Sequence, residues 1–433
     1  MSCMRVLDTT TFELKEAAYI EDFEKDGYAI LSHCWISKTE IIYQTLPKHI
    51  KELRYGKRPL SSPAVDKIYG ACETARKKGC KWMWIDTCCI DKSSTQETQE
   101  SINSMLKWYK DARLCVTYLF DVKRNDDATG EKVFCSTLKE NQLAKWVSRG
   151  WCVQELLAPK VVEFYDMNWE YLGERSDLSK PLSKLSGINE RYLNGQDYSN
   201  ACIAVKMSWM ASRTTTRPED IAYSLLGLLG VRMNVDYGEG ASAFLRLQET
   251  VMKSSKMDES LFAWRMPNPN DEARYESAKG FDENEWGLLA ASPRWFQESG
   301  DLRAPRSSRT FRLDQEQKAV RGPISRDMYN KKAKLVQAAG FFDFIGQPLA
   351  AITMNKRAEN DFALRLDCMR ADGQTAEIYL RPRTKDKISL TGNDMHKKPF
   401  IVCKRIQCDK IGFSEKPIKQ GMGDGIVLQP TPG

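Results

Sequence analysis

Short apolar runs alternate with helix-like patterns between Gly27 and Asp166, and this alternation limits the chain to a small group of folds. A strand followed by a helix and a second strand is the βαβ unit, which builds a mostly parallel sheet covered by helices. Four runs rich in β-branched or aromatic residues are predicted as the strands: 28–32, 82–86, 114–119 and 161–165. The sequence therefore predicts an α/β fold.

Three helices are expected between these strands. Apolar residues at helical spacing predict one helix over residues 64–78, which Gly79 would end. A second helix is expected over residues 101–112, and the polar residues 92–100 would supply its cap and first turn. The third is expected from about Gln142 to Leu157, just before the fourth strand.

The chain has 433 residues, which is more than a single hydrophobic core usually serves, so several structural units are expected. Residues 1–178 are predicted to form the α/β core, and residues 179–266 a helical extension of it. Turn-forming and polar residues indicate a linker over residues 267–300. Alternating apolar stretches separated by Gly, Pro and Asp predict a small β-rich domain over residues 301–433, with a loose tail from Gly421.

Composition narrows the classes of partner and compartment. The 65 basic and 58 acidic residues leave a net charge of only +7, without a Lys/Arg cluster interleaved with aromatic residues, so nucleic acid is not expected as a partner. No apolar run is long enough for a membrane span, and the first residues lack the apolar segment of a secretion signal. Thirteen cysteines without a C-x-x-C pair favour reduced thiols over a disulfide framework or a metal site. A cytoplasmic protein is expected.

Histidine is scarce, which limits the acid/base chemistry that this chain can perform. His33 is the most informative of the three histidines because it follows the first strand, and open parallel sheets bind ligands beyond the carboxyl ends of their strands. A Cys-His hydrolase would pair His33 with Cys34 or Cys88, although no nucleophile motif surrounds either cysteine. The alternative is a buried structural imidazole beside inert, packed thiols.

Two aspartates, Asp86 and Asp91, flank a pair of cysteines after the second strand, in the segment IDTCCIDK. A carboxylate at this edge of the sheet would orient a ribose hydroxyl or cap the next helix, because Asp is a favoured capping residue. Capping is the preferred interpretation of Asp91. Both interpretations remain open for Asp86.

The segment RGWCVQELLAP at residues 149–159 is the most informative part of the chain. Trp151 and Glu155 are four residues apart, so a helix would place the indole and the carboxylate on one face. A carboxylate beside an aromatic surface can stabilise the oxocarbenium-like centre that develops when a glycosidic C–N bond breaks. The alternative is a surface glutamate next to a core tryptophan, which amphipathic helices also contain.

The succession YAILSHCW, WIDTCCIDK, SINSMLKWYKDA and RGWCVQELLAP resembles the HET (heterokaryon incompatibility) domain of filamentous fungi. Further segments extend the resemblance to about residues 4 to 296: SWMASRTTTRPEDIAYSLLGLLGV, VDYGEGASAFLRLQE, SLFAW and GLLAASPRWF. Several motifs in the same order make it specific. The resemblance implies a part in vegetative incompatibility, a form of fungal innate immunity in which fusion of unlike strains triggers programmed cell death.

RGWCVQEL is also similar, more remotely, to the W-C-x-x-E-L segment of TIR domains. In catalytic TIR domains this glutamate is needed to cleave NAD into nicotinamide and an ADP-ribose product. The similarity implies a TIR-like, flavodoxin-like sheet, with NAD as a substrate and with neither a bound cofactor nor a metal. It implies Glu155 as the catalytic carboxylate and Trp151 as a wall of its pocket. The nicotinamide and ribose side would be lined by Ser32, His33, Trp35 and Asp86.

Two functions therefore stay open. The first is an NAD glycohydrolase (NADase), a hydrolase whose depletion of NAD would kill the cell. The second is a non-catalytic signalling module that self-associates or binds a protein partner in non-self recognition. Two departures from the usual HET pattern bear on the loop after the first strand: Cys34 replaces the more frequent Thr, and Ile36 replaces a Gly that would permit more backbone angles.

Overall fold

The computed structural model describes residues 4–20, 23–36, 39–56, 60–138, 142–254, 258–279 and 289–304, and then residues 312–314, 319–323, 362–382, 401–406, 412–414 and 425–428. The chain forms two compact units. The first contains residues 1–199 and 212–238, and the second contains residues 200–211 and 239–433. These limits differ from the four segments expected from the sequence, because the chain leaves the first unit after residue 199 and returns to it at residue 212.

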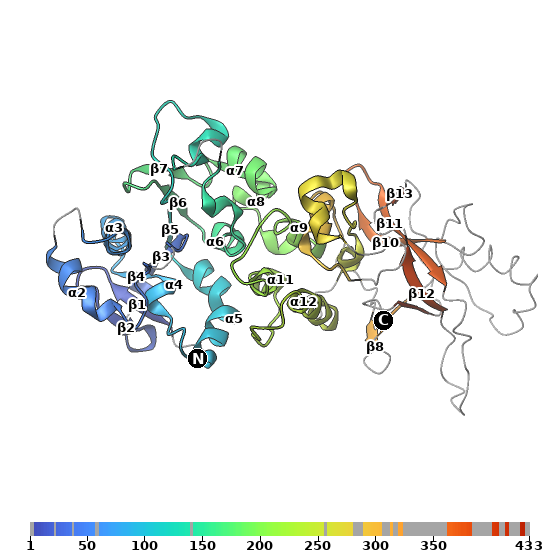
Figure 1. Ribbon diagram of the computed structural model, residues 1–433, viewed down its shortest axis with the longest axis horizontal. Helices are drawn as coiled ribbons and strands as arrows, with labels where there is room; N and C mark the ends of the chain where they lie inside the picture. Colours follow the sequence, from blue (N-terminus) through green and yellow to red (C-terminus); the bar gives the residue numbers. More distant parts are fainter. Residues whose placement is uncertain are drawn as a thin grey trace, which may run out of the picture. The chain divides into compact units, whose positions relative to one another are not determined.

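A seven-stranded sheet forms the centre of the first unit, in the order β2-β1-β4-β3-β5-β6-β7 (Figure 1). Its inner strands are parallel: β4 (Trp82–Trp84), β3 (Tyr28–His33), β5 (Leu114–Tyr118) and β6 (Val162–Tyr165). Taken in chain order, these strands are arranged 2-1-3-4, as in flavodoxin-like sheets. The predicted α/β class is confirmed.

The edge strands are antiparallel to their neighbours: β1 (Arg5–Asp8), β2 (Leu14–Glu16) and β7 (Tyr171–Glu174). All four inner strands are buried along their whole length, as the continuous apolar runs of a parallel sheet require. β4 ends at Trp84, two residues earlier than predicted, because Asp86 already begins the short helix α4 (Asp86–Cys89).

The two long helices begin at serine caps. The Ser62 hydroxyl accepts a hydrogen bond from the Val65 N–H at the start of α3 (Pro63–Lys77), and Ser94 caps α5 (Thr95–Asp111) in the same way. The interpretation of Asp91 as a helix cap is wrong. Its carboxylate accepts hydrogen bonds from the N–H and the hydroxyl of Ser93, and Asp91 lies four residues before Thr95, the first residue of the helix.

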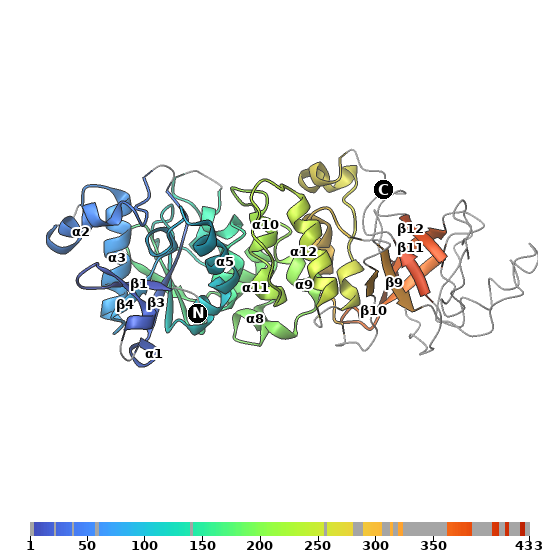
Figure 2. The same cartoon turned by 90° about the horizontal axis from the view of Figure 1, so that it is seen from below.

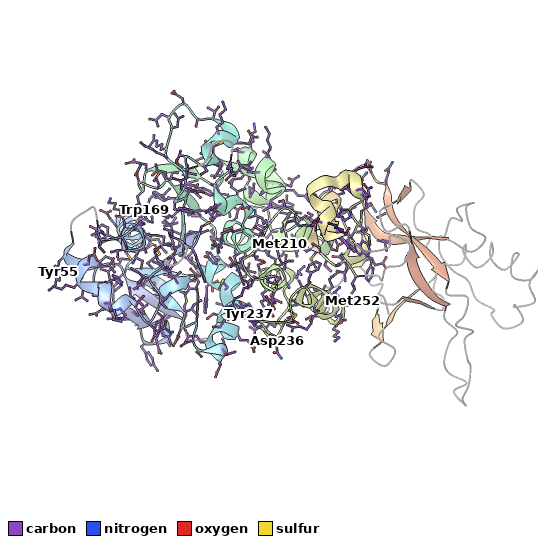
Figure 3. All side chains as sticks on the ribbon, in the orientation of Figure 1. Tyr55, Trp169, Met210, Asp236, Tyr237 and Met252 are labelled. Carbon is purple, nitrogen blue, oxygen red and sulfur yellow. The ribbon has the colours of Figure 1, made fainter. Side chains whose placement is uncertain are left out.

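α3 and α5 lie on opposite sides of the sheet, which follows from right-handed crossovers that run in opposite directions along it (Figures 1 and 2). α3 packs closely because of Gly70: a Cβ at this position would lie 2.1 Å from the indole of Trp169. Trp169, labelled in Figure 3, stacks on Tyr118 with ring centroids 4.4 Å apart. The glycine thus lets a helix and an aromatic stack share one face of the sheet.

The single helix expected over residues 142–157 is wrong. The chain forms a 3-10 helix, η3 (Lys145–Ser148), and then a separate helix, α6 (Cys152–Leu157). Between them, Arg149 forms an isolated parallel bridge with Thr214, and the Gly150 N–H donates a 2.9 Å hydrogen bond to the Thr214 carbonyl. Pairing with this distant segment replaces the helical hydrogen bonds that the local sequence would allow.

Further helices complete the first unit: α1 (Phe23–Asp26), α2 (Leu46–Tyr55), α7 (Ser179–Ser186), α8 (Glu190–Leu193), α10 (Asp220–Tyr223) and α11 (Leu226–Leu229). α11 packs on α5. This contact depends on Gly227, where a Cβ would lie 2.4 Å from the Cβ of Leu106. Residues 212–238 therefore belong to the α/β unit.

The second unit begins with short helices: α9 (Ile203–Ser208), α12 (Ser242–Lys253), η5 (Glu259–Phe262), η6 (Pro269–Ser277) and η7 (Pro293–Ser299). Trp295 of η7 packs against Trp264 with ring centroids 5.0 Å apart, and both rings are buried. The segment 267–300, expected as a linker, therefore contains packed helical turns.

A second sheet follows, in the order β10-β11-β12-β14-β9-β8, with β13 paired to β11. Its strands are β8 (Arg312–Asp314), β9 (Ala319–Pro323), β10 (Phe362–Met369), β11 (Thr375–Pro382), β12 (Ile401–Ile406), β13 (Gly412–Ser414) and β14 (Gly425–Leu428). β14 lies within the expected loose tail, the rest of which falls outside the described residues. Within the described part of the chain, none of the helices combines the length and the apolar character needed to cross a bilayer.

Candidate functional site

Ser32 of β3 and Glu155 of α6 meet at the carboxyl end of the central strand. The Ser32 hydroxyl donates a 2.5 Å hydrogen bond to Oε2 of Glu155, and the indole N–H of Trp146 donates a 2.7 Å hydrogen bond to the Ser32 oxygen. Ser32 is fully buried and only 7% of Glu155 is exposed. The carboxylate is therefore held below the surface by Ser32, whose own hydroxyl oxygen is held by Trp146.

Successive side chains of a strand point to opposite faces of the sheet, so the neighbours Ser32 and His33 lie in different surroundings. Ser32 faces α6, while His33 lies near Lys67 of α3 on the other face. The site residues expected from the sequence, other than Trp151, accordingly fall into two groups, each of which the structure extends by one further residue, Trp146 or Lys92. We call them the Glu155 group (Ser32, Trp146 and Glu155) and the Asp86 group (His33, Trp35, Asp86 and Lys92).

Burial raises the pKa of Glu155 to about 7, because a carboxylate loses hydration inside the protein. The hydrogen bond from Ser32 and the positive charge of Arg149 act in the opposite direction, since both stabilise the ionised form. Near neutral pH the side chain consequently exists in both protonation states. Carboxyls with such strongly raised pKa values occur preferentially at functional sites.

Asp86 organises the second group at the carboxyl end of β4. Its Oδ2 atom accepts a 3.0 Å hydrogen bond from the indole of Trp35 and a 3.1 Å hydrogen bond from Lys92. The Lys92 ammonium also lies over the Trp35 ring, 3.7 Å from its centroid, and 48% of Trp35 is exposed. Burial opposes ionisation of Asp86, but the charge and the hydrogen bond of Lys92 and the charge of Arg149 outweigh it and lower the pKa to about 2. Asp86 lies in the first turn of α4, whose N-cap is Ile85.

His33 is buried, and its Nε2 atom lies 3.6 Å from Oδ1 of Asp86, beyond hydrogen-bonding distance. Burial and the nearby Lys67 charge hold the pKa of His33 well below its usual value, despite the opposite effect of Asp86. The imidazole is therefore neutral at physiological pH. Lys67 itself is buried in an ion pair with Glu40, which also accepts a hydrogen bond from the Ile36 N–H and so anchors the loop after β3.

Arg149 connects the two groups electrostatically, because its charge lowers the pKa of both Glu155 and Asp86. The sequence analysis did not single out Arg149, Trp146 or Lys92 as site residues. A signal existed for two of them, since Arg149 begins the RGWCVQEL segment and Lys92 ends the IDTCCIDK segment. Trp146 lacked such a signal, since only the fold places it on Ser32.

Trp151, expected beside the Glu155 carboxylate, is engaged elsewhere. It is half-buried at the start of α6, and its side chain interacts with the carboxylate of Asp220 in α10, which opposes the rise in the pKa of Asp220 that burial causes. Asp220 also accepts a 3.0 Å hydrogen bond from the hydroxyl of Tyr237. The structure thus assigns Trp151 a definite partner 69 residues further along the chain, according to the residue numbers.

The cysteines considered as nucleophiles are buried. Burial raises the pKa of Cys34 to about 12 and that of Cys88 well above its usual value, so neither forms a thiolate near neutral pH. This electrostatic environment disfavours the Cys-His hydrolase alternative. In the described ranges, His, Cys, Asp and Glu form no group of three or more suited to a metal ion.

Two family models match parts of the chain. Residues 28–142 match the heterokaryon incompatibility protein (HET) model, and residues 242–323 match a domain of unknown function (DUF8212). The vegetative incompatibility protein HET-E-1 of Podospora anserina is 40% identical over 272 residues, which are 62% of this chain and 19% of that protein. This chain thus corresponds to about a fifth of the length of that relative. No solved structure matches the chain significantly. The chain therefore carries a heterokaryon incompatibility (HET) domain, matched within residues 28–142.

Proposed function

We propose that this HET-domain protein cleaves NAD into nicotinamide and an ADP-ribose product, and that Glu155 is the catalytic carboxylate. One observation carries the proposal: Ser32 fixes the buried Glu155 at the carboxyl ends of the parallel strands, where open α/β sheets bind their ligands. Keeping a buried carboxylate with a raised pKa costs stability, which favours a functional role for it. Loss of cellular NAD would then cause the cell death of incompatibility.

In the proposed reaction, the bond between the nicotinamide nitrogen and the ribose carbon breaks, and both bonding electrons leave with nicotinamide. Water adds to the ribosyl cation and releases a proton, which yields ADP-ribose. The ionised Glu155 stabilises the positive charge while it develops. The activity rises with the fraction of Glu155 that is ionised. Because the pKa of Glu155 is about 7, activity should begin to rise near neutral pH.

The Asp86 group would receive the nicotinamide end of the substrate. Trp35 combines an exposed aromatic surface with a fixed orientation, because Asp86 holds its indole and Lys92 covers one side of the ring. A fixed aromatic surface binds a planar base at a low cost in conformational entropy. In this scheme Asp86 is a positioning residue for Trp35, and Ser32 is a positioning residue for Glu155.

The direct test measures nicotinamide release from NAD by the purified full chain. Wild type is compared with Glu155→Gln and with Glu131→Gln, a control that changes a surface glutamate paired with Lys184. We expect Glu155→Gln to lower the rate at least about 100-fold, as loss of an electrostatic stabiliser does, and the control to match wild type. Nicotinamide release that is the same in Glu155→Gln and in wild type would refute the role of Glu155.

A second function, a non-catalytic signalling module, is favoured by the low exposure of Glu155, only 7% of which is accessible. In that case the HET domain would associate with itself or with a protein partner in non-self recognition. Release should therefore also be measured over a range of protein concentrations, because self-association can complete a site. Folded wild type that releases no nicotinamide at any concentration supports the signalling module.

A further inference from the structure

The short helix α6, which carries Glu155, starts without a side-chain cap. Its N-cap position is Trp151, whose side chain does not hydrogen bond to the first turn. Helices of only six residues are not stable in isolation, because few hydrogen bonds offset the cost of nucleation. The position of Glu155, three residues into this helix, must therefore be fixed by tertiary contacts.

Residues 213–220 make several of these contacts with the backbone that leads into α6. The Thr214 N–H donates a 2.8 Å hydrogen bond to the Ser148 carbonyl, and the Thr214 carbonyl accepts one of 2.9 Å from the Gly150 N–H. Between them, the buried Arg213 donates a 2.9 Å hydrogen bond to the Arg149 carbonyl. Three consecutive residues, 148–150, are thus held by a segment more than 60 residues away.

Asp220 extends these contacts to the next residue. Its carboxylate interacts with the side chain of Trp151, which occupies the N-cap position of α6. Tyr237, labelled in Figure 3, donates a 3.0 Å hydrogen bond to the same carboxylate, and Arg217 lies over the Tyr237 ring at 4.0 Å. Asp220 is thereby fixed from its other side, so it can fix Trp151 in turn.

We propose that residues 213–220 form a clamp that sets the position of Glu155: Arg213 and Thr214 hold the backbone before α6, and Asp220 acts as a positioning residue of the site through its interaction with Trp151. This inference rests on the proposed function for its catalytic part. The clamp also gives the indole of Trp151 a structural role, because this side chain links α10 to the beginning of the helix that bears the Glu155 carboxylate. The clamp lies well beyond residues 28–142, the part that matches the HET family model.

The clamp predicts a specific change in kinetics. Asp220→Ala removes the group that interacts with the Trp151 side chain and lets α6 shift, whereas Asp220→Asn keeps a polar group of the same shape. A misplacement of about 1 Å can lower the rate of an oriented reaction on the order of 100-fold. We therefore expect Asp220→Ala to lower kcat for NAD cleavage at least about tenfold with KM changed less than about threefold, and Asp220→Asn to restore most of the rate.

Hydrogen exchange followed by mass spectrometry tests the clamp independently of activity. Asp220→Ala should increase exchange at residues 148–157 and leave exchange in β3 and β5 unchanged. Trp151→Phe removes only the indole donor, so it should give the same local increase and serves as a second variant should Asp220→Ala not fold. Asp127→Ala, at an exposed aspartate of the same unit, is the control and should behave as wild type.

The outcomes separate the clamp from the proposed function. Unchanged exchange at residues 148–157 in both variants overturns the clamp, and so does an equal increase throughout the sheet, because that result indicates general destabilisation. If wild type does not cleave NAD, or if Glu155→Gln cleaves it normally, the proposed function fails, and exchange alone then decides the clamp. If wild type cleaves NAD and Asp220→Ala keeps the wild-type kcat, Asp220 is not a positioning residue.

Discussion

The hydroxyl of Ser32 donates its hydrogen bond to the carboxylate of Glu155 across 123 residues of sequence. When Glu155 is ionised the direction of this bond is fixed, because a carboxylate has no proton to donate and the indole N–H of Trp146 donates to the Ser32 oxygen. A donor pointed at a carboxylate stabilises its ionised form. The ionisation of Glu155 therefore depends on the central strand of the sheet.

Ser32→Ala should shift the pH dependence of NAD cleavage. Loss of the hydroxyl removes a contact that lowers the pKa of Glu155, so this pKa should rise above its value of about 7. The acidic limb of the kcat/KM profile, which reports ionisation of Glu155, should move to higher pH by about one unit or less. Profiles measured from pH 5.5 to 9 check this. An acidic limb at the wild-type position would show that Ser32 does not control the ionisation.

Glu155→Gln should stabilise the fold at high pH and have little effect at low pH. The pKa of Glu155 is about 7 in the folded chain against an ordinary value of 4.5, so the folded state prefers the protonated carboxyl. Wild type therefore loses stability as the pH rises from 4.5 to about 7, by about 3 kcal/mol for a shift of this size. Glutamine cannot ionise and escapes this loss.

Urea unfolding of both proteins at pH 5 and pH 8 measures the effect. The free energy of unfolding of Glu155→Gln minus that of wild type should be larger at pH 8 than at pH 5, by on the order of 3 kcal/mol. Glu131→Gln, in the surface pair with Lys184, should show no such dependence. A difference between Glu155→Gln and wild type that stays constant with pH would mean that Glu155 is hydrated in the folded protein.

Much of the fold follows from local sequence, and the reason is visible in the strands. Residues 28–32 and 114–119 are predicted correctly because parallel inner strands are buried on both faces and read as continuous apolar runs. The edge strands β2 and β7 contain exposed or half-buried residues and lack that pattern. Local sequence also failed between Gln142 and Leu157, where pairing of Arg149 with Thr214 interrupts the expected helix.

The candidate site was predictable only in part. Ser32 and Glu155 stood out because one ends the first strand and the other lies in a recognisable motif, but their hydrogen bond depends on how α6 packs on β3. The spacing of Trp151 and Glu155 suggested a shared ligand surface. The structure gives Trp151 a partner, Asp220, that helical spacing cannot reveal, since the contact joins segments that are far apart in the sequence.

Asp86→Asn should destabilise the protein near neutral pH and lose this effect in acid. The pKa of Asp86 is about 2 in the folded chain and ordinarily 3.8, so the folded state favours the carboxylate. Its contribution is present above pH 3.8 and disappears as the pH falls through about 2. Because Asp86 is partly exposed, we expect about 1 to 2 kcal/mol.

Unfolding of wild type and Asp86→Asn at pH 6 and pH 3 checks this expectation, since the gap between them should narrow at the lower pH. Asp126→Asn, which alters a surface pair with Arg124, is a suitable control. A gap that persists unchanged at pH 3 would show that Asp86 contributes through the shape of its hydrogen bonds with Trp35 and Lys92 rather than through its charge.

The rate of labelling by iodoacetamide should distinguish the buried thiols from the exposed one. Nine of the ten cysteines whose side-chain burial the structure describes are buried, and the tenth, Cys135, is exposed. Alkylation requires an accessible thiolate, which burial prevents at Cys34 and Cys88 both by excluding the reagent and by raising the pKa. Among the ten cysteines, only Cys135 should react within minutes at pH 7.5, as read by mass spectrometry of the native protein. Fast labelling of Cys34 or Cys88 would contradict this expectation and restore the Cys-His hydrolase as a candidate, because it would reveal a reactive thiolate beside His33.

The matching functional test is Cys88→Ala, which should leave NAD cleavage at the wild-type rate while Glu155→Gln abolishes it.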